Sequence, residues 1–424
     1  MKIEIRNGRL VDPRNEVDVQ ASLYLDAGKV AARGEAPRGW RAEHVVDAAG
    51  LVVCPGLIDA SARLREPGLE HKATLESEMA AALAGGVTSL ACPPDTDPPL
   101  DEPGLVEMLK HRARSLEAAH VYPIGALTVG LKGENITEMG ELAEAGCIAF
   151  SHADTALGDT QVLLRALQYA ATFGHAVWLR PQDAALARGG VAHDGEMATR
   201  LGLPPIPSFA ETIALDTIFE LVRATGVRVH LARLSTHEGV ARVRAAKKAR
   251  LPITCDVAIH HVHLCDVDIG WFDAHCHLVP PLRGTRDREA LRAGLADGTI
   301  DLICSDHSPV DDDAKQLPFA EAEAGATGLE LLLPLTLKWA REEKLPLAAA
   351  LARITSAPAR VLGLSAGHLS VGADADVCVF DPKAHWRVEP SALKSQGKNT
   401  PFLGFELEGL VRYTLVGGHV VHEA

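Results

Sequence analysis

The sequence predicts an α/β fold in which a TIM-type (β/α)8 barrel is joined to a small β-sandwich formed by both chain ends. In the middle of the chain, apolar strand-like runs alternate with helical patterns over roughly 300 residues, which is typical of parallel βαβ units closed into a barrel. Both ends contain only short alternating β-type pieces. No glycine-rich phosphate loop follows the first strand, so nucleotide binding has no support. With 424 residues, 47% of them hydrophobic, the chain can bury a core of barrel size.

The expected barrel strands are short, apolar and separated by helical patterns. The first is the run from Leu51 to Val53, directly before a Pro/Gly-rich segment. Two of the intervening helices are expected at residues 74–84 and 105–118. The later strands are expected at residues 88–92, 121–124, 147–150, 175–179, 227–231, 253–257 and 302–304.

The expected domains are residues 1–53 and 367–424 for the two parts of the β-sandwich and residues 54–366 for the barrel. Turns are predicted at Asn7-Gly8, Ala27-Gly28 and Gly417-Gly418. Short strands of this kind cannot form a core alone, so we expect the two ends to pair with each other.

Composition excludes several partners. The net charge of −14 argues against nucleic acid and anionic membranes, which require a basic surface. No apolar run approaches the length of a membrane span, and the first residues lack an apolar signal core, so a cytoplasmic location is expected. The eight scattered cysteines contain no CxxC pair, which favours reduced thiols over disulfides or a zinc knuckle.

The segment from Pro55 to Gly68, PGLIDASARLREPG, closely resembles the signature of the dihydroorotases, members of the cyclic amidohydrolases. In that family the frame reads Asp-x-His-x-His-Leu-Arg-Glu-Pro-Gly, and its two histidines hold catalytic metal. Here the two positions are Ser61 and Arg63. Serine is a poor zinc ligand, and the guanidinium of arginine has no acceptor atom.

Further family motifs are altered at the same functional positions. The resemblance places Asp95 where the family has a substrate-facing Asn, and His152 in the place of an acidic metal-site residue. It also places Arg180 and Arg233 where the family has the third and fourth metal histidines. Repulsion between a divalent ion and three guanidinium groups in one pocket is on the order of several kcal/mol per pair. The expectation is a cavity without metal or cofactor, whose lost ligand positions are Ser61, Arg63, His152, Arg180 and Arg233.

Some of the family's site is retained. The segment from Ser305 to Pro309 resembles Thr-Asp-His-Ala-Pro, which implies a former general base at Asp306 and a former substrate contact at His307. Arg65 matches the arginine that helps to hold the substrate carboxylate. Without activated water, Asp306 is expected to form an ion pair with Arg63, Arg180 or Arg233.

The histidines between His260 and His277 are a separate possibility. Their spacing fits no standard zinc pattern, so hydrogen-bonded or exposed histidines are expected there.

These observations favour the hypothesis of a catalytically inactive dihydroorotase-like subunit, a pseudoenzyme. The resemblance implies assembly with the catalytic chain of aspartate transcarbamoylase in pyrimidine biosynthesis, and a homo-oligomer. The first alternative is a metal-independent or mononuclear cyclic amide hydrolase of the dihydroorotase type that uses Asp306, His307 and His152. The second alternative is a sensor whose arginines bind a carboxylated metabolite.

Overall fold

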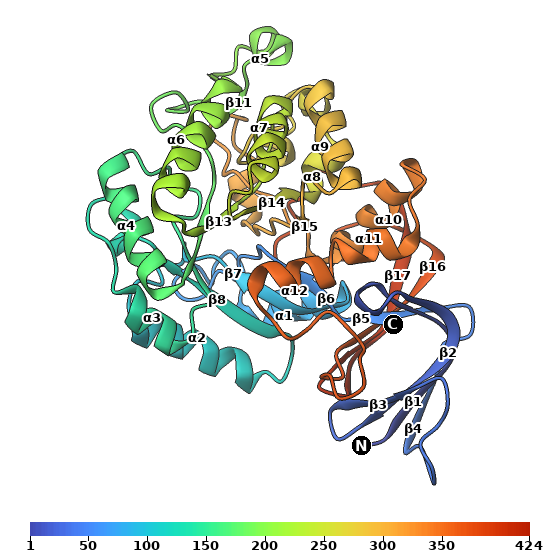
Figure 1. Cartoon of the computed structure of the whole chain (residues 1–424). Helices are drawn as coiled ribbons and strands as arrows, with labels where there is room; N and C mark the ends of the chain where they lie inside the picture. The colour runs from blue at the N-terminus through green and yellow to red at the C-terminus, as the bar shows by residue number, and fades with distance from the viewer.

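The computed structural model describes residues 1–424 and contains two large sheets (Figure 1). The first is an eight-stranded parallel sheet, as expected for a (β/α)8 barrel, with the order β15-β14-β13-β10-β9-β8-β7-β6. Its strands are β6 Leu57–Asp59, β7 Val87–Cys92, β8 His120–Ala126, β9 Ala149–Ser151, β10 Ala176–Leu179, β13 Arg228–Leu231, β14 Ile253–Ala258 and β15 Leu302–Cys304.

The first and last barrel strands meet beyond their carboxyl ends. The amide of Arg63 donates to the carbonyl of His307 at 2.9 Å, and the amide of His307 donates to the carbonyl of Ser61 at 3.2 Å. These bonds bring the segments after β6 and β15 together at the mouth of the barrel. The predicted barrel is therefore confirmed.

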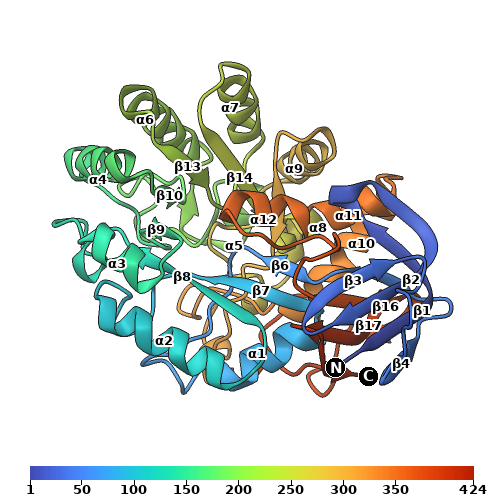
Figure 2. The same cartoon turned by 60° about the horizontal axis from the view of Figure 1, so that its bottom comes forward.

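Helices surround the strands, as Figure 2 shows from a second direction. A buried core of 79 residues includes residues of the strands and of these helices, and a smaller core of 12 residues includes alanines of β7, β9 and β14. The helices are α1 Leu75–Ala84, α2 Pro103–Ser115, α3 Met139–Ala145, α4 Thr160–Phe173, α5 Glu196–Leu201, α6 Phe209–Thr225, α7 His237–Lys248, α8 Ile259–His263, α9 Thr285–Asp297, α10 Leu332–Glu342, α11 Leu347–Ala352 and α12 Ser356–Leu362.

The second large sheet is built from both chain ends and encloses its own core of 14 buried residues. Its strands form one continuous hydrogen-bonded sheet, and they lie side by side in Figure 1 although they come from opposite ends of the sequence. They are β1 Ile3–Asp12, β2 Val17–Asp26, β3 Lys29–Arg33, β4 His44–Asp47, β5 Val52–Pro55, β16 Val377–Arg387, β17 Glu406–Val416 and β18 His419–Glu423. A two-stranded sheet joins β11 Ala192–His193 to β12 Pro205–Ile206.

Two local predictions were wrong. The apolar run from Leu51 to Val53 enters β5 of the end sheet, and the first barrel strand is the shorter β6 that follows Gly56. Periodicity cannot tell to which sheet a buried strand belongs. Asn7-Gly8 is a bulge within β1 and not a turn, with a positive φ of 63° at Asn7.

The other two predicted turns are confirmed. Ala27-Gly28 connects β2 to β3, and Gly417-Gly418 connects β17 to β18, with positive φ at all four residues. The predicted domain boundaries at residues 53/54 and 366/367 stay a prediction. None of the helices is both long and apolar enough to cross a membrane.

Candidate functional site

The candidate site lies at the carboxyl ends of the barrel strands, where charged side chains from several strand ends converge. Such strand ends carry the active site in barrels of this type. The residues are Arg63 after β6, Asp95 after β7, Asp154 after β9, Arg180 after β10, Arg233 after β13 and Asp306 after β15.

Arg63 is the centre of this cluster and contacts three carboxylates. Its Nε donates to Asp95 at 2.7 Å, and its Nη2 donates to Asp154 at 2.7 Å. Its Nη1 donates to Ser308 at 2.8 Å and to Asp306 at 3.3 Å. Only 5% of its side chain is exposed. The guanidinium is therefore fixed in the barrel mouth.

Arg233 and Arg180, which follow other strands, both approach the carboxylate of Asp154. Arg233 donates from Nη1 to Asp306 at 2.8 Å and from Nη2 to Asp154. The Nε of Arg180 lies 3.2 Å from Asp154, and its Nη1 donates to Gln182. The predicted ion pair of Asp306 is thus found with Arg63 and Arg233, whereas Arg180 pairs with Asp154.

The charges of these groups respond to burial and to each other. Burial opposes the charge of Asp154, but Arg233 and Arg63 hold the pKa of that carboxyl well below its usual range. Burial raises the pKa of Asp306, against the opposing effect of the same two arginines. Burial lowers the pKa of Arg180 to about 10. All three arginines therefore remain cationic at neutral pH.

The backbone at the barrel mouth contains four non-glycine residues with positive φ. The angles are 65° at Arg65, 50° at Ala153, 57° at Arg233 and 48° at Asp306. Side chains rarely adopt this conformation, and strain of this kind concentrates at functional sites. The amide of Arg233 is also held by the carboxylate of Asp256 at 2.6 Å. The strand ends are thus bent to direct charged groups into one space.

That space includes a cavity of about 160 Å³ above the cluster. Arg63, Arg65, Asp95, Asp154 and Asp306 line it, together with Val279, Ser308, Glu323, Ala324 and Gly325. The Oδ1 atom of Asp95 is buried there without a hydrogen-bond partner. The predicted substrate-side residues Arg65 and Asp95 therefore face one cavity with Asp306. A larger groove of about 470 Å³ lies outside the barrel, between α8, α9 and α10, and is separate from this cluster.

The donor set does not fit a metal pair. The groups that converge at the mouth are the guanidiniums of Arg63, Arg180 and Arg233, which offer no lone pair, and carboxylates already paired with them. Ser61 lines a small void of about 20 Å³ beneath this cluster. We therefore derive no chemical step through a metal ion.

His152 and His307 do not line the cavity, so they are not placed to act with Asp306 as the hydrolase alternative requires. Both ring nitrogens of His152 are used, by Thr128 at 2.8 Å and by the carbonyl of Thr155 at 2.8 Å. His307 is fully buried, and its ring contacts Glu78 at 2.6 Å, not the cavity. The ring of His307, which the resemblance gave as a former substrate contact, is held by Glu78 and does not line the cavity.

The histidines from His260 to His277 do not form one cluster. His261 contacts the carbonyl of Pro280 at 3.1 Å, His263 contacts that of Leu335 at 2.9 Å, and His277 contacts that of Ala322 at 2.8 Å. Burial lowers the pKa of His260 to about 3 and that of His261 to about 4. The rings of His260 and His261 are therefore neutral, and those of His261, His263 and His277 bind backbone carbonyls of the surrounding scaffold.

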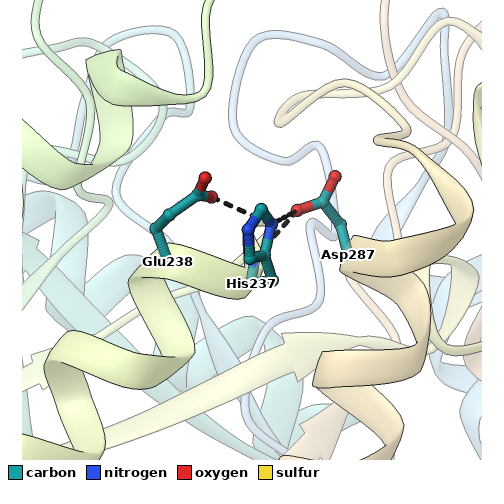
Figure 3. Close-up of side chains that lie close together, drawn as sticks. All are labelled: His237, Glu238 and Asp287. Atoms are coloured by element: carbon teal, nitrogen blue, oxygen red, sulfur yellow. Dashed lines mark hydrogen bonds and ion pairs between the residues drawn. The ribbon is translucent and has the colours of Figure 1, made fainter.

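One further group of potential ligands lies outside the barrel mouth. Figure 3 shows His237 between Glu238 and Asp287, at the start of α7 and in the first turn of α9. Both carboxylates approach the same nitrogen, Nδ1, at 3.0 and 2.7 Å. Asp287 also accepts hydrogen bonds from the amides of His237 and Gly284. Its carboxylate therefore serves to join the ends of two helices.

Asp154 is the site residue that sequence reasoning missed. It lies two residues after His152, which stands where the family has an acidic metal-site residue, and no role was predicted for it. A signal was present, because an acidic residue follows closely where that family acid is lost. Ser308 and Glu323 were missed as well, since their approach to Arg63 and Arg65 depends on how the loops fold.

Comparisons with known proteins match the whole chain to dihydroorotase-like proteins and amidohydrolases. The Dihydro-orotase-like family profile matches residues 50–239, and the Amidohydrolase family profile matches residues 209–422. A "Dihydroorotase-like protein" of Pseudomonas aeruginosa is 46% identical over 423 residues and is covered completely. A "Dihydroorotase" of Geotalea daltonii is 41% identical over 423 residues, again with complete coverage of both chains.

Solved structures of hydantoinases share the fold. An L-hydantoinase from Arthrobacter aurescens superposes with a TM-score of 0.89 at 24% identity, covering 99% of this chain and 96% of that chain. A D-hydantoinase structure gives a TM-score of 0.83 at 21% identity, with 100% and 95% coverage.

The prediction that this chain is not an enzyme is wrong. It rested on the replaced metal ligands, but relatives with 40 and 41% identity along their full length carry the enzyme name dihydroorotase. Ligand replacement identifies a changed site and does not by itself remove an activity. The fold, the strand-end site and the full-length relatives together show that the chain belongs to the dihydroorotase-like family of amidohydrolases.

Proposed function

We propose that this protein is a dihydroorotase-type cyclic amide hydrolase that works without a metal pair. The observation that carries this proposal is the arrangement of Asp306. Its Oδ1 accepts from both Arg63 and Arg233, whereas its Oδ2 has no partner within the protein and the side chain lines the cavity. One carboxylate oxygen is thus positioned and the other is available to a water molecule.

In the proposed reaction, Asp306 accepts a proton from water as the water oxygen bonds to the ring carbonyl carbon. The charge that develops on the carbonyl oxygen is stabilised by the adjacent guanidinium groups of Arg63 and Arg233. The ring carbon–nitrogen bond then breaks, and the leaving nitrogen takes the proton from Asp306. The products are a carboxylic acid, which releases its proton to solvent at neutral pH, and a ureido or amide group, so the step adds one water molecule.

The test is turnover of dihydroorotate, and of carbamoyl aspartate in reverse, by protein dialysed against a chelator. We expect activity that chelation does not abolish, and a loss of about 100-fold or more in kcat for Asp306→Asn, the range for removal of a general base. Glu76→Gln, an exposed change on α1, is the control. Absence of turnover above the uncatalysed rate, or turnover that Asp306→Asn leaves unchanged, contradicts the proposal.

The same proposal fixes a direction for pH dependence. Asp306 must be ionised to accept a proton, and burial raises its pKa above that of an ordinary aspartate. The rate should therefore fall as the pH drops through that raised pKa, and it should be constant above it. A pH profile of kcat/KM for the chelated protein measures this, and a rate that rises toward acidic pH contradicts it.

A second candidate function is binding of a carboxylated metabolite without turnover. It is favoured by the convergence of three guanidinium groups on one carboxylate, that of Asp154. In that case carbamoyl aspartate raises the thermal unfolding midpoint but is recovered unchanged.

A further inference from the structure

Asp154 occupies a position in which one carboxylate satisfies three arginines. Its Oδ2 accepts from Nη2 of Arg63 at 2.7 Å. Its Oδ1 accepts from Nη2 of Arg233 and lies 3.2 Å from Nε of Arg180. Charge-assisted hydrogen bonds of this number and geometry are typical of a site that binds a small carboxylate.

The arginines are fixed, whereas the carboxylate is at the solvent side. The side chains of Arg63, Arg180 and Arg233 are each 5% exposed, but that of Asp154 is 35% exposed. Asp154 belongs to the segment between the end of β9 and the start of α4, which has no regular secondary structure.

Two of the arginines have further partners besides Asp154. Arg63 is also held by Asp95 and Ser308, and Arg233 is also held by Asp306 and by the carbonyl of Val279. The donors that face Asp154 are therefore arranged before any carboxylate binds them.

Charge balance explains why this position must be filled. Three cations, Arg63, Arg180 and Arg233, face three anions, Asp95, Asp154 and Asp306. Removal of one anion leaves an uncompensated buried cation, which is costly. With Asp154 in place, the charged side chains that line the cavity include two cations, Arg63 and Arg65, and four carboxylates. An anionic ligand is then repelled unless a carboxylate leaves.

We propose that Asp154 is a tethered carboxylate plug: it fills an anion site formed by Arg63, Arg180 and Arg233, and a small carboxylate ligand displaces it on binding. The ligand class follows from the donors and from the cavity of about 160 Å³, which accepts a small molecule bearing one or two carboxylates. The plug extends the proposed hydrolase function, and it rests on that function only for the identity of the natural ligand. Displacement would transfer the Nη2 donors of Arg63 and Arg233, beside Asp306, from Asp154 to the ligand carboxylate.

The test is rescue of Asp154→Ala by formate or acetate. Removal of the side chain leaves the anion site empty, so the thermal unfolding midpoint should fall and then rise saturably with added formate, by about 3 °C or more. Chloride at equal ionic strength should have a smaller effect. The wild type should respond less at the same concentrations, because its own carboxylate competes.

Asp216→Ala serves as the matched control, since it removes the carboxylate of an exposed pair with Arg242. It should show no saturable response to formate. If Asp154→Ala folds only with an anion present, it is purified in formate, and the fall of its unfolding midpoint on dialysis against chloride measures the binding. Equal responses of wild type and variant, or no rescue and no binding, overturn the plug.

Turnover is read separately. Rescue by formate without turnover of cyclic amides supports the plug and contradicts the hydrolase. Turnover of cyclic amides without rescue by formate supports the hydrolase and contradicts the plug.

Discussion

Asp59 is a fully buried carboxylate that has no cation in contact with it. Its Oδ1 accepts from the amides of Ser305 at 2.9 Å and Ser61 at 3.3 Å, and its Oδ2 accepts from the hydroxyl of Ser305. Burial raises its pKa to about 6, although these hydrogen bonds favour the charged form. The carboxyl joins the ends of β6 and β15 directly beneath the site.

This residue gives the stability of the protein a pH dependence with a definite sign. An unfolded aspartate titrates near pH 4, so the native state holds the proton more tightly than the unfolded state. The contribution of Asp59 is therefore complete below about pH 4 and declines as the pH rises to about 6, by at most about 3 kcal/mol.

In Asp59→Asn this decline should disappear. Urea unfolding of wild type and variant between pH 4 and pH 7 measures the difference in the free energy of unfolding. Asp216→Asn, at an exposed position, should retain the wild-type slope. A difference that is constant with pH would show that Asp59 does not titrate in this range.

Among the elements, the turn after β6 illustrates how a loop is fixed against its neighbour. Gly68 has a positive φ of 88°, and a Cβ atom there would lie 1.7 Å from the carbonyl oxygen of Asp97. The amide of Asp97 also donates to the carbonyl of Pro67 at 3.0 Å. This close approach holds together the loops that present Arg65 and Asp95.

We expect Gly68→Ala to lower the free energy of unfolding by about 3 kcal/mol or more, since backbone strain and overlap add. Gly50→Ala is the matched control, with a positive φ of 80° and nothing within 4 Å. It should cost only about 1 kcal/mol. Equal losses in urea unfolding would mean that backbone strain alone accounts for the glycine.

A second connection between elements is made by Glu78 in α1. Its Oε2 accepts from His307 at 2.6 Å and from the hydroxyl of Ser395 at 2.7 Å, and its Oε1 accepts from the amide of Gln396 at 2.9 Å. The carboxylate thus links the first barrel helix to the loop after β15 and to a segment near the carboxyl end of the chain.

Glu78→Gln should destabilise the protein by about 3 kcal/mol, because an amide cannot accept at both positions and leaves buried donors unpaired. Glu76→Gln, on the exposed side of the same helix, should change stability by less than about 0.5 kcal/mol. The midpoints of urea unfolding compare them. Similar midpoints for the two variants would contradict a linking role of Glu78.

At the scale of the whole molecule, the end sheet is attached to the barrel by packing and by direct bonds. The hydroxyl of Thr414 in β17 donates to the carbonyl of Leu83 in α1 at 2.7 Å. The chain passes from β5 of one sheet to β6 of the other through Gly56. The backbone of Gly56 lies against Thr88, and a Cβ atom added to Gly56 would be 2.1 Å from Oγ1 of Thr88.

Association with the catalytic chain of aspartate transcarbamoylase, and formation of a homo-oligomer, stay predictions that the family resemblance supports. On a sizing column with light scattering, we expect this protein alone to exceed the mass of one chain. A mixture with the transcarbamoylase should elute earlier than either component. Separate elution at micromolar concentration would contradict the association.

The sequence by itself determined the barrel, because strand and helix periodicities are local and recur along the chain. It also determined the replacement of metal ligands by Ser61, Arg63, Arg180 and Arg233, since a guanidinium cannot bind metal in any fold. An ion pair of Asp306 with Arg63, Arg180 or Arg233 followed from the need to neutralise buried charge, and the structure contains the pairs with Arg63 and Arg233.

Only the tertiary structure decided that Asp154 completes the cluster and that His307 turns toward Glu78. It also decided that residues 52–55 join the end sheet, so that the three-residue β6 is the first strand of the barrel. The physical reason is the same in each case. Several partners were chemically possible, and the choice among them depended on which groups distant in sequence came within hydrogen-bonding distance.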